Sequence, residues 1–266
     1  MYIVMRPSSG NTTLKAGCSP MTNETYHRLY TDMAWTWPII RPVEGYLTEA
    51  RRIIGLLNSY ASPIARKVLH LGSGGGHLGS HLKYAYTITG VDASPTMNAL
   101  ARNLNPEATY FEGDMRTFRS TERFDVVLIS EAIAYMQDEQ ALSEVFETAY
   151  HHLKPGGVLV TYAEETLAGF QQNLTRHFQG TAPGIDVTMI ENRYDPDVTD
   201  TTYEATFILL IRRDGVLETV IDRHTLGLFP LNTWHAYLNM TGFTVHQINM
   251  GRGNDRVPWF VGVKPL

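Results

Sequence analysis

Val68-Leu69-His70-Leu71-Gly72-Ser73-Gly74-Gly75-Gly76-His77 joins a short apolar run directly to a loop that consists mostly of glycine. A short apolar run followed by turn residues is typical of a buried strand. Glycines let the main chain turn tightly and let a ligand lie against the bare backbone at the carboxyl end of the strand. Glycine-rich turns also serve as plain strand-to-helix connections, so the loop alone does not identify a ligand.

Short β-rich runs alternate with helical patterns from residue 67 onward, and this rhythm indicates βαβ units and a parallel sheet. Ser94 and Asp138 are suitable residues to begin two of the intervening helices. We therefore predict an α/β fold with a doubly wound, mostly parallel, Rossmann-like sheet. The predicted strands are Val68–Leu71, Thr87–Val91, Thr109–Glu112, Val126–Ser130 and Val158–Tyr162.

The flanks of this sheet have a different texture. Before it, two helical stretches at 22–33 and 43–60 predict a helical lid over about residues 22–60, preceded by a loose extension at 1–20. After it, alternating apolar residues on both sides of Asp214-Gly215 predict an antiparallel hairpin insertion over about residues 186–228. A helix at 232–240 and strands at 243–248 and 259–263 complete a single domain spanning 21–266.

Composition narrows the classes of function. The 266 residues carry a formal net charge of −5, which argues against a nucleic-acid substrate because phosphate-backbone binding needs a positive field. Cys18 is the single cysteine, so an internal disulfide is impossible, and no Cys/His spacing of the zinc type occurs. The first residues lack the apolar core of a signal peptide, and no apolar run is long enough to span a membrane. We expect a cytoplasmic protein.

The spacing of the glycines discriminates between ligands. Dinucleotide-binding enzymes use GxGxxG, in which the third glycine lets the helix pack closely beneath a pyrophosphate. Here the glycines stand at positions 72, 74, 75 and 76, and position 77 is a histidine. This pattern favours a ligand without a pyrophosphate.

Carboxylates follow the next two strands. Asp92 ends the second strand and can accept hydrogen bonds from both hydroxyls of a ribose; its alternative role, capping a helix, is already available to Ser94. Asp114 follows the third strand, where it can accept from an adenine amino group while Met115 packs on the ring. A solvated loop carboxylate is the alternative for Asp114. Three such features at successive strand ends together predict an adenosyl ligand.

As a set, these motifs resemble those of class I S-adenosylmethionine-dependent methyltransferases over about residues 65–165. More loosely, residues 26–264 are similar to the aminosugar N-methyltransferase branch. The matching stretches are Leu71-Gly72-Ser73-Gly74-Gly75-Gly76, Val91-Asp92, Gly113-Asp114-Met115-Arg116, Phe124-Asp125-Val126-Val127, Leu153-Lys154-Pro155-Gly156-Gly157 and, for the branch, Tyr26-His27-Arg28-Leu29-Tyr30 and His224-Thr225-Leu226-Gly227-Leu228-Phe229.

The resemblance implies S-adenosylmethionine as cofactor, S-adenosylhomocysteine as product and a small-molecule methyl acceptor. Residues expected around the cofactor are Tyr30, His70, Gly72, Ser73, Gly74, Asp92, Ala93, Met97, Asp114, Met115 and Ser130.

The chain departs from the family at two positions. His70 stands where the family usually has an acid near the methionine amino group; a neutral imidazole could accept a hydrogen bond there, but a protonated one would repel the ammonium. Tyr135 stands where the aminosugar branch has a histidine after the fourth strand.

A sulfonium methyl is already activated, so the protein has mainly to align a nucleophile and exclude water, and we expect no metal. Tyr135, Glu131 and His224 are the candidate catalytic residues, because a nearby acceptor can remove or orient a proton of the nucleophile. Asp222 precedes His224 at period two, so both can face one side of a strand. Alternative roles are cofactor binding or turn capping for Glu131 and a surface or structural role for His224.

Two other functions remain open at this point. An NAD(P)-dependent oxidoreductase would explain the glycines and Asp92, but it predicts a glycine where His77 stands. A methyltransferase-like binding protein without catalysis would be consistent with His70. The acceptor, and whether the hairpin insertion makes a homodimer, are not specified by the sequence.

Overall fold

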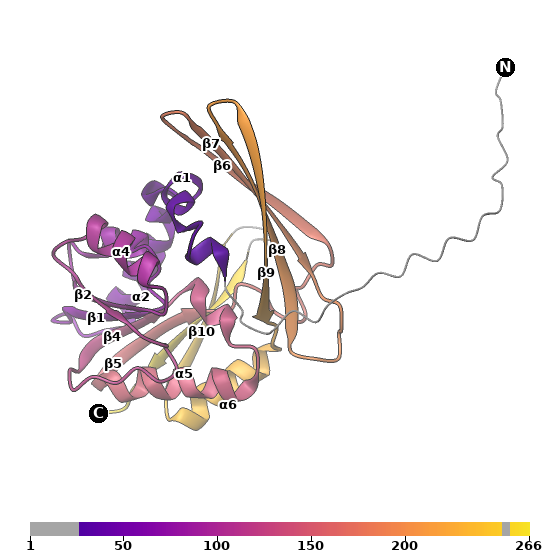
Figure 1. The fold of residues 1–266 in the computed structure, drawn as a ribbon. Helices are drawn as coiled ribbons and strands as arrows, with labels where there is room; N and C mark the ends of the chain where they lie inside the picture. Colours follow the sequence, from indigo (N-terminus) through magenta and orange to yellow (C-terminus); the bar gives the residue numbers. More distant parts are fainter. Residues whose placement is uncertain (1–26, 252–255) are drawn as a thin grey trace, which may run out of the picture.

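A seven-stranded sheet lies at the centre of the computed structural model, which describes residues 27–251 and 256–266 (Figure 1). Its strand order is β10-β11-β5-β4-β1-β2-β3; the first five strands of the chain pair in parallel, and β11 joins β5 in antiparallel orientation. The doubly wound prediction is confirmed. The strands are β1 (Lys67–Leu71), β2 (Thr87–Asp92), β3 (Thr109–Glu112), β4 (Phe124–Ile129), β5 (Leu153–Tyr162), β10 (Thr244–Met250) and β11 (Val257–Val263).

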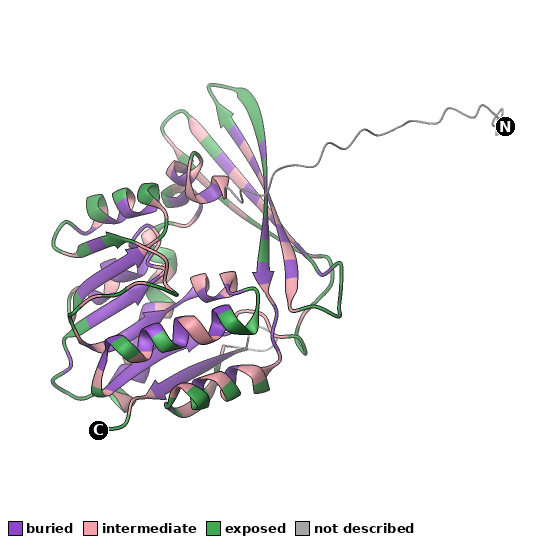
Figure 2. Cartoon of the chain, turned by 60° about the horizontal axis from the view of Figure 1, so that its bottom comes forward, coloured by how far each residue is buried: buried purple, intermediate pink, exposed green. Residues whose placement is uncertain are grey.

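Helices cover both faces of this sheet, and its central strands are buried over most of their length (Figure 2). Successive residues of β1 point to opposite faces, so Val68 packs with α2 and α3, whereas Leu69 packs with α5 and α6. Burial on both sides explains why these strands are continuous apolar runs in the sequence. The helices are α2 (Leu47–Tyr60), α3 (His77–Leu82), α4 (Pro95–Leu104), α5 (Glu139–His152) and α6 (Leu231–Thr241).

The two predicted helix caps are confirmed. Ser94 Oγ accepts a hydrogen bond from the Met97 N–H at 3.1 Å, and Asp138 Oδ1 accepts from the Ala141 N–H at 2.7 Å. Each side chain thereby satisfies a main-chain donor that has no partner inside its helix.

A separate four-stranded antiparallel sheet packs one face against the N-terminal segment (Figure 1). The predicted turn at Asp214-Gly215 is present, with positive φ angles of 49° and 84°. This sheet begins at Leu174, earlier than the expected residue 186. The sequence did not predict its first strand, because that strand is polar and mostly exposed and therefore lacks an apolar alternation. Its strands are β6 (Leu174–Ala182), β7 (Ile185–Tyr194), β8 (Thr202–Arg213) and β9 (Val216–Gly227).

In the N-terminal segment the helix expected at 43–60 is present, as a 3₁₀ turn that continues into α2, whereas the residues before it form only short helices. Within residues 27–33 the predicted helix is wrong: the structure has a single 3₁₀ turn, and the Leu29 N–H donates to Asp222 of β9 at 2.7 Å. A long-range contact therefore fixes this backbone. The extension at 1–20 and residues 22–26 lie outside the described residues. The segment comprises η1 (Arg28–Tyr30), η2 (Ala34–Thr36), α1 (Trp37–Ile40) and η3 (Val43–Tyr46) before α2.

Among the helices in the described part of the chain, none has the length and apolarity needed to cross a membrane.

Candidate functional site

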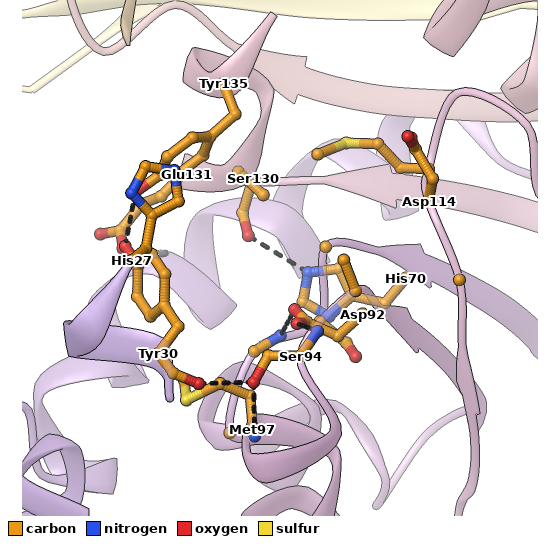
Figure 3. A pocket seen from close by; sticks show the side chains of 18 of the residues that line it. His27, Tyr30, His70, Asp92, Ser94, Met97, Asp114, Ser130, Glu131 and Tyr135 are labelled. Carbon is orange, nitrogen blue, oxygen red and sulfur yellow. Dashed lines mark hydrogen bonds between the residues drawn. The ribbon is translucent and has the colours of Figure 1, made fainter. Parts of the chain in front are cut away.

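A cavity of about 680 Å³ lies between the carboxyl ends of the parallel strands and the N-terminal segment (Figure 3). This volume is in the range of small-molecule sites in proteins. Every residue expected around the cofactor lines it, as do the candidate catalytic residues Glu131 and Tyr135. Lining residues that the sequence analysis did not propose for the site include His27, Tyr46, His77 and Gln137.

Two glycines of the loop after β1 are required by geometry. Gly72 has a φ of +69°, and a Cβ there would lie 2.2 Å from the Ala132 Cβ. Gly76 has a φ of +78° and precedes α3, where a Cβ would lie 2.7 Å from the Asn105 Nδ2. In a dinucleotide motif the third glycine, which would stand at position 77, allows the close packing of the helix. Here Gly76 allows it instead, so position 77 can carry a side chain, and His77 lines the cavity.

Asp92 connects the loop after β1 to the residue that precedes α4 at the rim of the cavity. Its carboxylate accepts from the Gly74 N–H at 2.7 Å and from the Ser94 N–H at 2.9 Å, one bond on each oxygen. Burial raises the pKa of Asp92, and these two bonds oppose the rise. Because a carboxylate oxygen can accept more than one hydrogen bond, both oxygens retain capacity for ribose hydroxyls. Ser73 Oγ is buried and has no partner among the described residues, so these groups fit an adenosyl ligand.

His70 lies at the base of the cavity, where its Nε2 is 3.1 Å from the Ser130 Oγ. Burial lowers the pKa of His70 to about 4, so the ring is neutral at neutral pH. A neutral imidazole can accept a hydrogen bond from an ammonium group. The repulsion that the sequence analysis considered for a protonated His70 is therefore absent at neutral pH.

The loop after β3 places Met115 and Asp114 on the cavity. The Met115 Cε is 3.7 Å from the position that a Cβ on Gly72 would occupy, which brings this side chain against the glycine loop. Asp114 forms an ion pair with Arg116 at 2.5 Å, and this hydrogen bond lowers the pKa of the carboxyl group. The carboxylate that was expected to meet an adenine amino group is thus shared with an arginine.

A chain of hydrogen bonds lies on the opposite side of the cavity. The Tyr30 and Tyr135 hydroxyls are 3.0 Å apart, the Tyr135 hydroxyl is 2.6 Å from His224 Nδ1, and His224 Nε2 is 2.9 Å from Asp222 Oδ2. A carboxylate only accepts, so we assign the His224 proton to Nε2, which leaves the Nδ1 lone pair to accept from Tyr135. Three segments remote in sequence, η1, η4 (Glu131–Tyr135) and β9, meet here.

His27 adds a second imidazole to this group. Its ring centroid is 4.1 Å from that of His224, and its Nδ1 is buried without a partner among the described residues. Burial, assisted by the neighbouring His224, lowers the pKa of His27 to about 4. His27 is therefore neutral at neutral pH. His27 lies in one of the stretches that match the aminosugar branch, but no role was predicted for it.

Glu131 is held by an arginine of the N-terminal segment. Arg41 Nη2 is 2.6 Å from Glu131 Oε1. The guanidinium also lies 5.7, 5.4 and 5.2 Å from the ring centres of Trp37, Tyr46 and Phe178. Burial raises the pKa of Glu131 and Arg41 opposes the rise. No local pattern marks an arginine whose partner is 90 residues away, so Arg41 was missed.

Known proteins share both the sequence motifs and the fold. Residues 68–157 match the family described as a methyltransferase domain. The chain is 34% identical over 225 residues to the dTDP-3-amino-3,4,6-trideoxy-alpha-D-glucopyranose N,N-dimethyltransferase of Streptomyces venezuelae, covering 82% of this chain and 91% of that relative.

Solved structures give the same result for the fold. The sugar N-methyltransferase KedS8 from Streptoalloteichus has a TM-score of 0.79 at 22% identity, covering 97% of this chain and 100% of that one. The S-adenosylmethionine-bound amino pentose methyltransferase CalS10 from Micromonospora echinaspora has a TM-score of 0.73 at 20% identity, covering 90% and 98%. Nothing in these similarities supports the oxidoreductase alternative.

Proposed function

The chain belongs to the S-adenosylmethionine-dependent methyltransferases, in the branch of the aminosugar N-methyltransferases, and on this premise we propose that its acceptor is the amine of an amino sugar. It is an enzyme that uses S-adenosylmethionine and transfers a methyl group to a small-molecule acceptor. The relative in Streptomyces venezuelae is named for an amino sugar joined to dTDP. The observation that carries the proposal is the proton-accepting chain that runs from Tyr135, which lines the cavity containing the cofactor motifs, to His224, which is buried behind it and does not line the cavity itself.

For the cofactor, we propose that Asp92 accepts from the ribose hydroxyls and that Ser73 and Gly74 lie against the ligand. His70 and Ser130 would accept from the methionine ammonium, since both are held at that end of the cavity. Met115 would pack on the adenine. Ala93 and Met97 complete the lining beside Asp92, and Tyr30 closes it from the N-terminal segment (Figure 3).

When bound, S-adenosylmethionine supplies a methyl group on a positively charged sulfur, ready for in-line attack. An amine that arrives as an ammonium ion must first lose a proton, because only the neutral nitrogen has a free lone pair. The Tyr135 oxygen can take that proton as its own proton moves to His224 Nδ1. Burial raises the pKa of Tyr135 well above its ordinary value, so we propose a coupled transfer in which no free tyrosinate forms.

Glu131 borders the same cavity from the start of η4. Because its carboxylate is paired with Arg41, we propose that it orients the acceptor by accepting a hydrogen bond and does not itself carry the proton. Trp37 borders the cavity and is 8% exposed, so it packs in the core, and we propose that it also covers the bound cofactor.

The experiment is a mass-spectrometric assay of the wild-type protein with S-adenosylmethionine and matched acceptors. The acceptors are a dTDP-amino sugar, the same amino sugar without the nucleotide, and a dTDP-sugar with a hydroxyl in place of the amine. We expect one or two methyl groups on the amine and none on the hydroxyl compound. Methylation of the hydroxyl compound alone would contradict the proposal.

For assembly, we propose a homodimer through the outer face of the antiparallel sheet. Ile190, Ile208 and Ile221 stand side by side on neighbouring strands, and their side chains point away from the core face that packs on Leu29 and Trp37. Ile221 is 50% exposed. We expect light scattering to give twice the chain mass for the wild type and the monomer mass for Ile208→Lys; a monomeric wild type would contradict this proposal.

A further inference from the structure

Asp222 joins two parts of the molecule through one oxygen atom. Its Oδ2 accepts from the main-chain N–H of Leu29 at 2.7 Å and from His224 Nε2 at 2.9 Å. Asp222 is 6% exposed, and Leu29 and His224 are fully buried. Leu29 belongs to the N-terminal segment, 193 residues away in sequence. The carboxylate that holds the imidazole therefore also holds the segment that closes the cavity.

We propose that Asp222 is a positioning residue which makes proton transfer to His224 depend on docking of the N-terminal segment at Leu29. The inference rests on the proposed function, because it assumes that the acceptor must lose a proton. It concerns a residue that touches neither the acceptor nor the cofactor. Its two hydrogen bonds are the physical link between closure of the cavity and assembly of the proton acceptor.

Asp222 acts on His224 in two ways. By accepting from Nε2–H it fixes the tautomer whose Nδ1 lone pair faces the Tyr135 hydroxyl. It also stabilises the positive charge that His224 gains when a proton arrives, as the buried aspartate does in the Ser-His-Asp triad. One N–H bond of the acceptor breaks, one O–H bond of Tyr135 forms while the other breaks, and one N–H bond forms at His224 Nδ1. The acceptor nitrogen keeps its electron pair.

The docked segment is held at a second point by the cofactor side of the cavity. Ser94 Oγ donates to the main-chain oxygen of Tyr30 at 2.5 Å, beside the carboxylate of Asp92. Tyr30 also reaches the Tyr135 hydroxyl. The segment thus spans from the rim proposed to hold the ribose to the imidazole proposed to take the proton. Loss of the Asp222 contact is expected to free one end of this span.

The pH dependence of turnover gives a direct readout of this role. The titratable groups packed around His224 are His27 and Tyr30 from the N-terminal segment, Tyr135 from η4 and Asp222 from β9, with Tyr203 of β8 beyond Tyr135. Removing the negative charge at residue 222 destabilises protonated His224 and so moves the acid limb of the kcat/KM profile to lower pH.

The test compares Asp222→Asn, Asp222→Ala and the control Glu218→Gln, which removes the same charge at an exposed position of the same strand. In Asp222→Asn the amide oxygen can still accept from Leu29 and His224. We expect kcat to fall about 10- to 100-fold, the acid limb to move to lower pH, and Leu29 to stay protected in hydrogen exchange. In Asp222→Ala we expect the protection at Leu29 to be lost as well. Glu218→Gln should match the wild type in every measurement.

Three results would overturn the inference. The first is a kcat/KM profile of Asp222→Asn that superimposes on that of Glu218→Gln. The second is unchanged protection of Leu29 in Asp222→Ala. The third is loss of wild-type activity to a chelator, since His27, Asp222 and His224 offer atoms within 4.8 Å of one another and would then act as metal ligands. Failure of the proposed function gives a different result: the wild type would methylate no amine, while hydrogen exchange at Leu29 would still report docking.

Discussion

The side of the cavity proposed to hold the cofactor and the side proposed to hold the methyl acceptor are built in different ways. On the cofactor side, Asp92 bonds to main-chain groups 18 and 2 residues away, so neighbouring turns of one sheet edge suffice to form it. On the acceptor side, the hydrogen bonds of Tyr135 and the bond of Asp222 to Leu29 span 89 to 193 residues and connect three separate segments. On the proposed assignment, a local motif binds the cofactor, whereas the docking of remote segments assembles the groups that take the proton.

This contrast separates the expected effects of substitution. Changes on the cofactor side should alter affinity for S-adenosylmethionine or the stability of the sheet. Changes on the acceptor side should alter turnover and leave cofactor affinity nearly constant. Each of the following experiments changes one residue on one of these two sides.

His224→Gln is expected to have the largest effect. Glutamine can hydrogen-bond but cannot take a proton, so kcat should fall at least about 100-fold, while the Kd for S-adenosylmethionine stays within about twofold. Steady-state kinetics and calorimetry measure the two quantities. The exposed His177→Gln is the control and should match the wild type. A large loss of cofactor affinity in His224→Gln would contradict the expectation that acceptor-side residues do not affect cofactor binding.

Acid should destabilise the fold through His70 on the cofactor side. The pKa of His70 is lowered to about 4 by burial, whereas the unfolded chain binds a proton there near pH 6.5. The unfolded state therefore gains protons first as the pH falls, and stability declines between about pH 6.5 and pH 4. We expect His70 to contribute about 2 kcal/mol of this loss between pH 7 and pH 5.

Urea unfolding at pH 7, 6 and 5 measures the effect. His70→Gln should show a shallower decline than the wild type, and His177→Gln should decline like the wild type. If stability declines equally with pH in all three proteins, His70 binds a proton as readily in the folded protein as in the unfolded chain.

Asp92→Ala is expected to weaken cofactor binding at least tenfold, on the order of 1.4 kcal/mol, by removing the acceptor proposed for the ribose. Calorimetric titration with S-adenosylmethionine measures it, with the exposed Asp186→Ala as a matched control. Wild-type affinity in Asp92→Ala would move the nucleoside to another part of the cavity.

Tyr135→His should have the smallest effect. The aminosugar branch has a histidine at the matching position, and an imidazole there could take the proton directly, so kcat should stay within about fivefold of the wild type. Tyr135→Phe, which removes the hydroxyl bonded to His224, should lose more than tenfold. If Tyr135→His is as slow as Tyr135→Phe, residue 135 does not carry the proton.

The same contrast explains what the sequence could reveal. The strand ends bearing Gly72, Asp92 and Met115 were predictable because each motif is continuous in the chain and follows a recognisable strand. The pairing of Asp222 with His224 was accessible from their spacing alone.

Contacts between remote segments were not accessible. Of the helix expected at residues 22–33, the described part, 27–33, was wrong because Asp222 binds the Leu29 N–H, and no local propensity encodes that bond. The strand Leu174–Ala182 was missed because a polar edge strand has no apolar alternation to read. Arg41 depends on Glu131 for its role, and only the fold brings the two together.

The most direct test is a crystal structure of the protein with S-adenosylhomocysteine and the methylated-amine acceptor identified by the mass-spectrometric assay. We expect the ribose on Asp92 and the acceptor nitrogen within hydrogen-bonding distance, about 3 Å, of the Tyr135 oxygen. An acceptor nitrogen that lies away from Tyr135, with another group positioned to take its proton, would contradict the account.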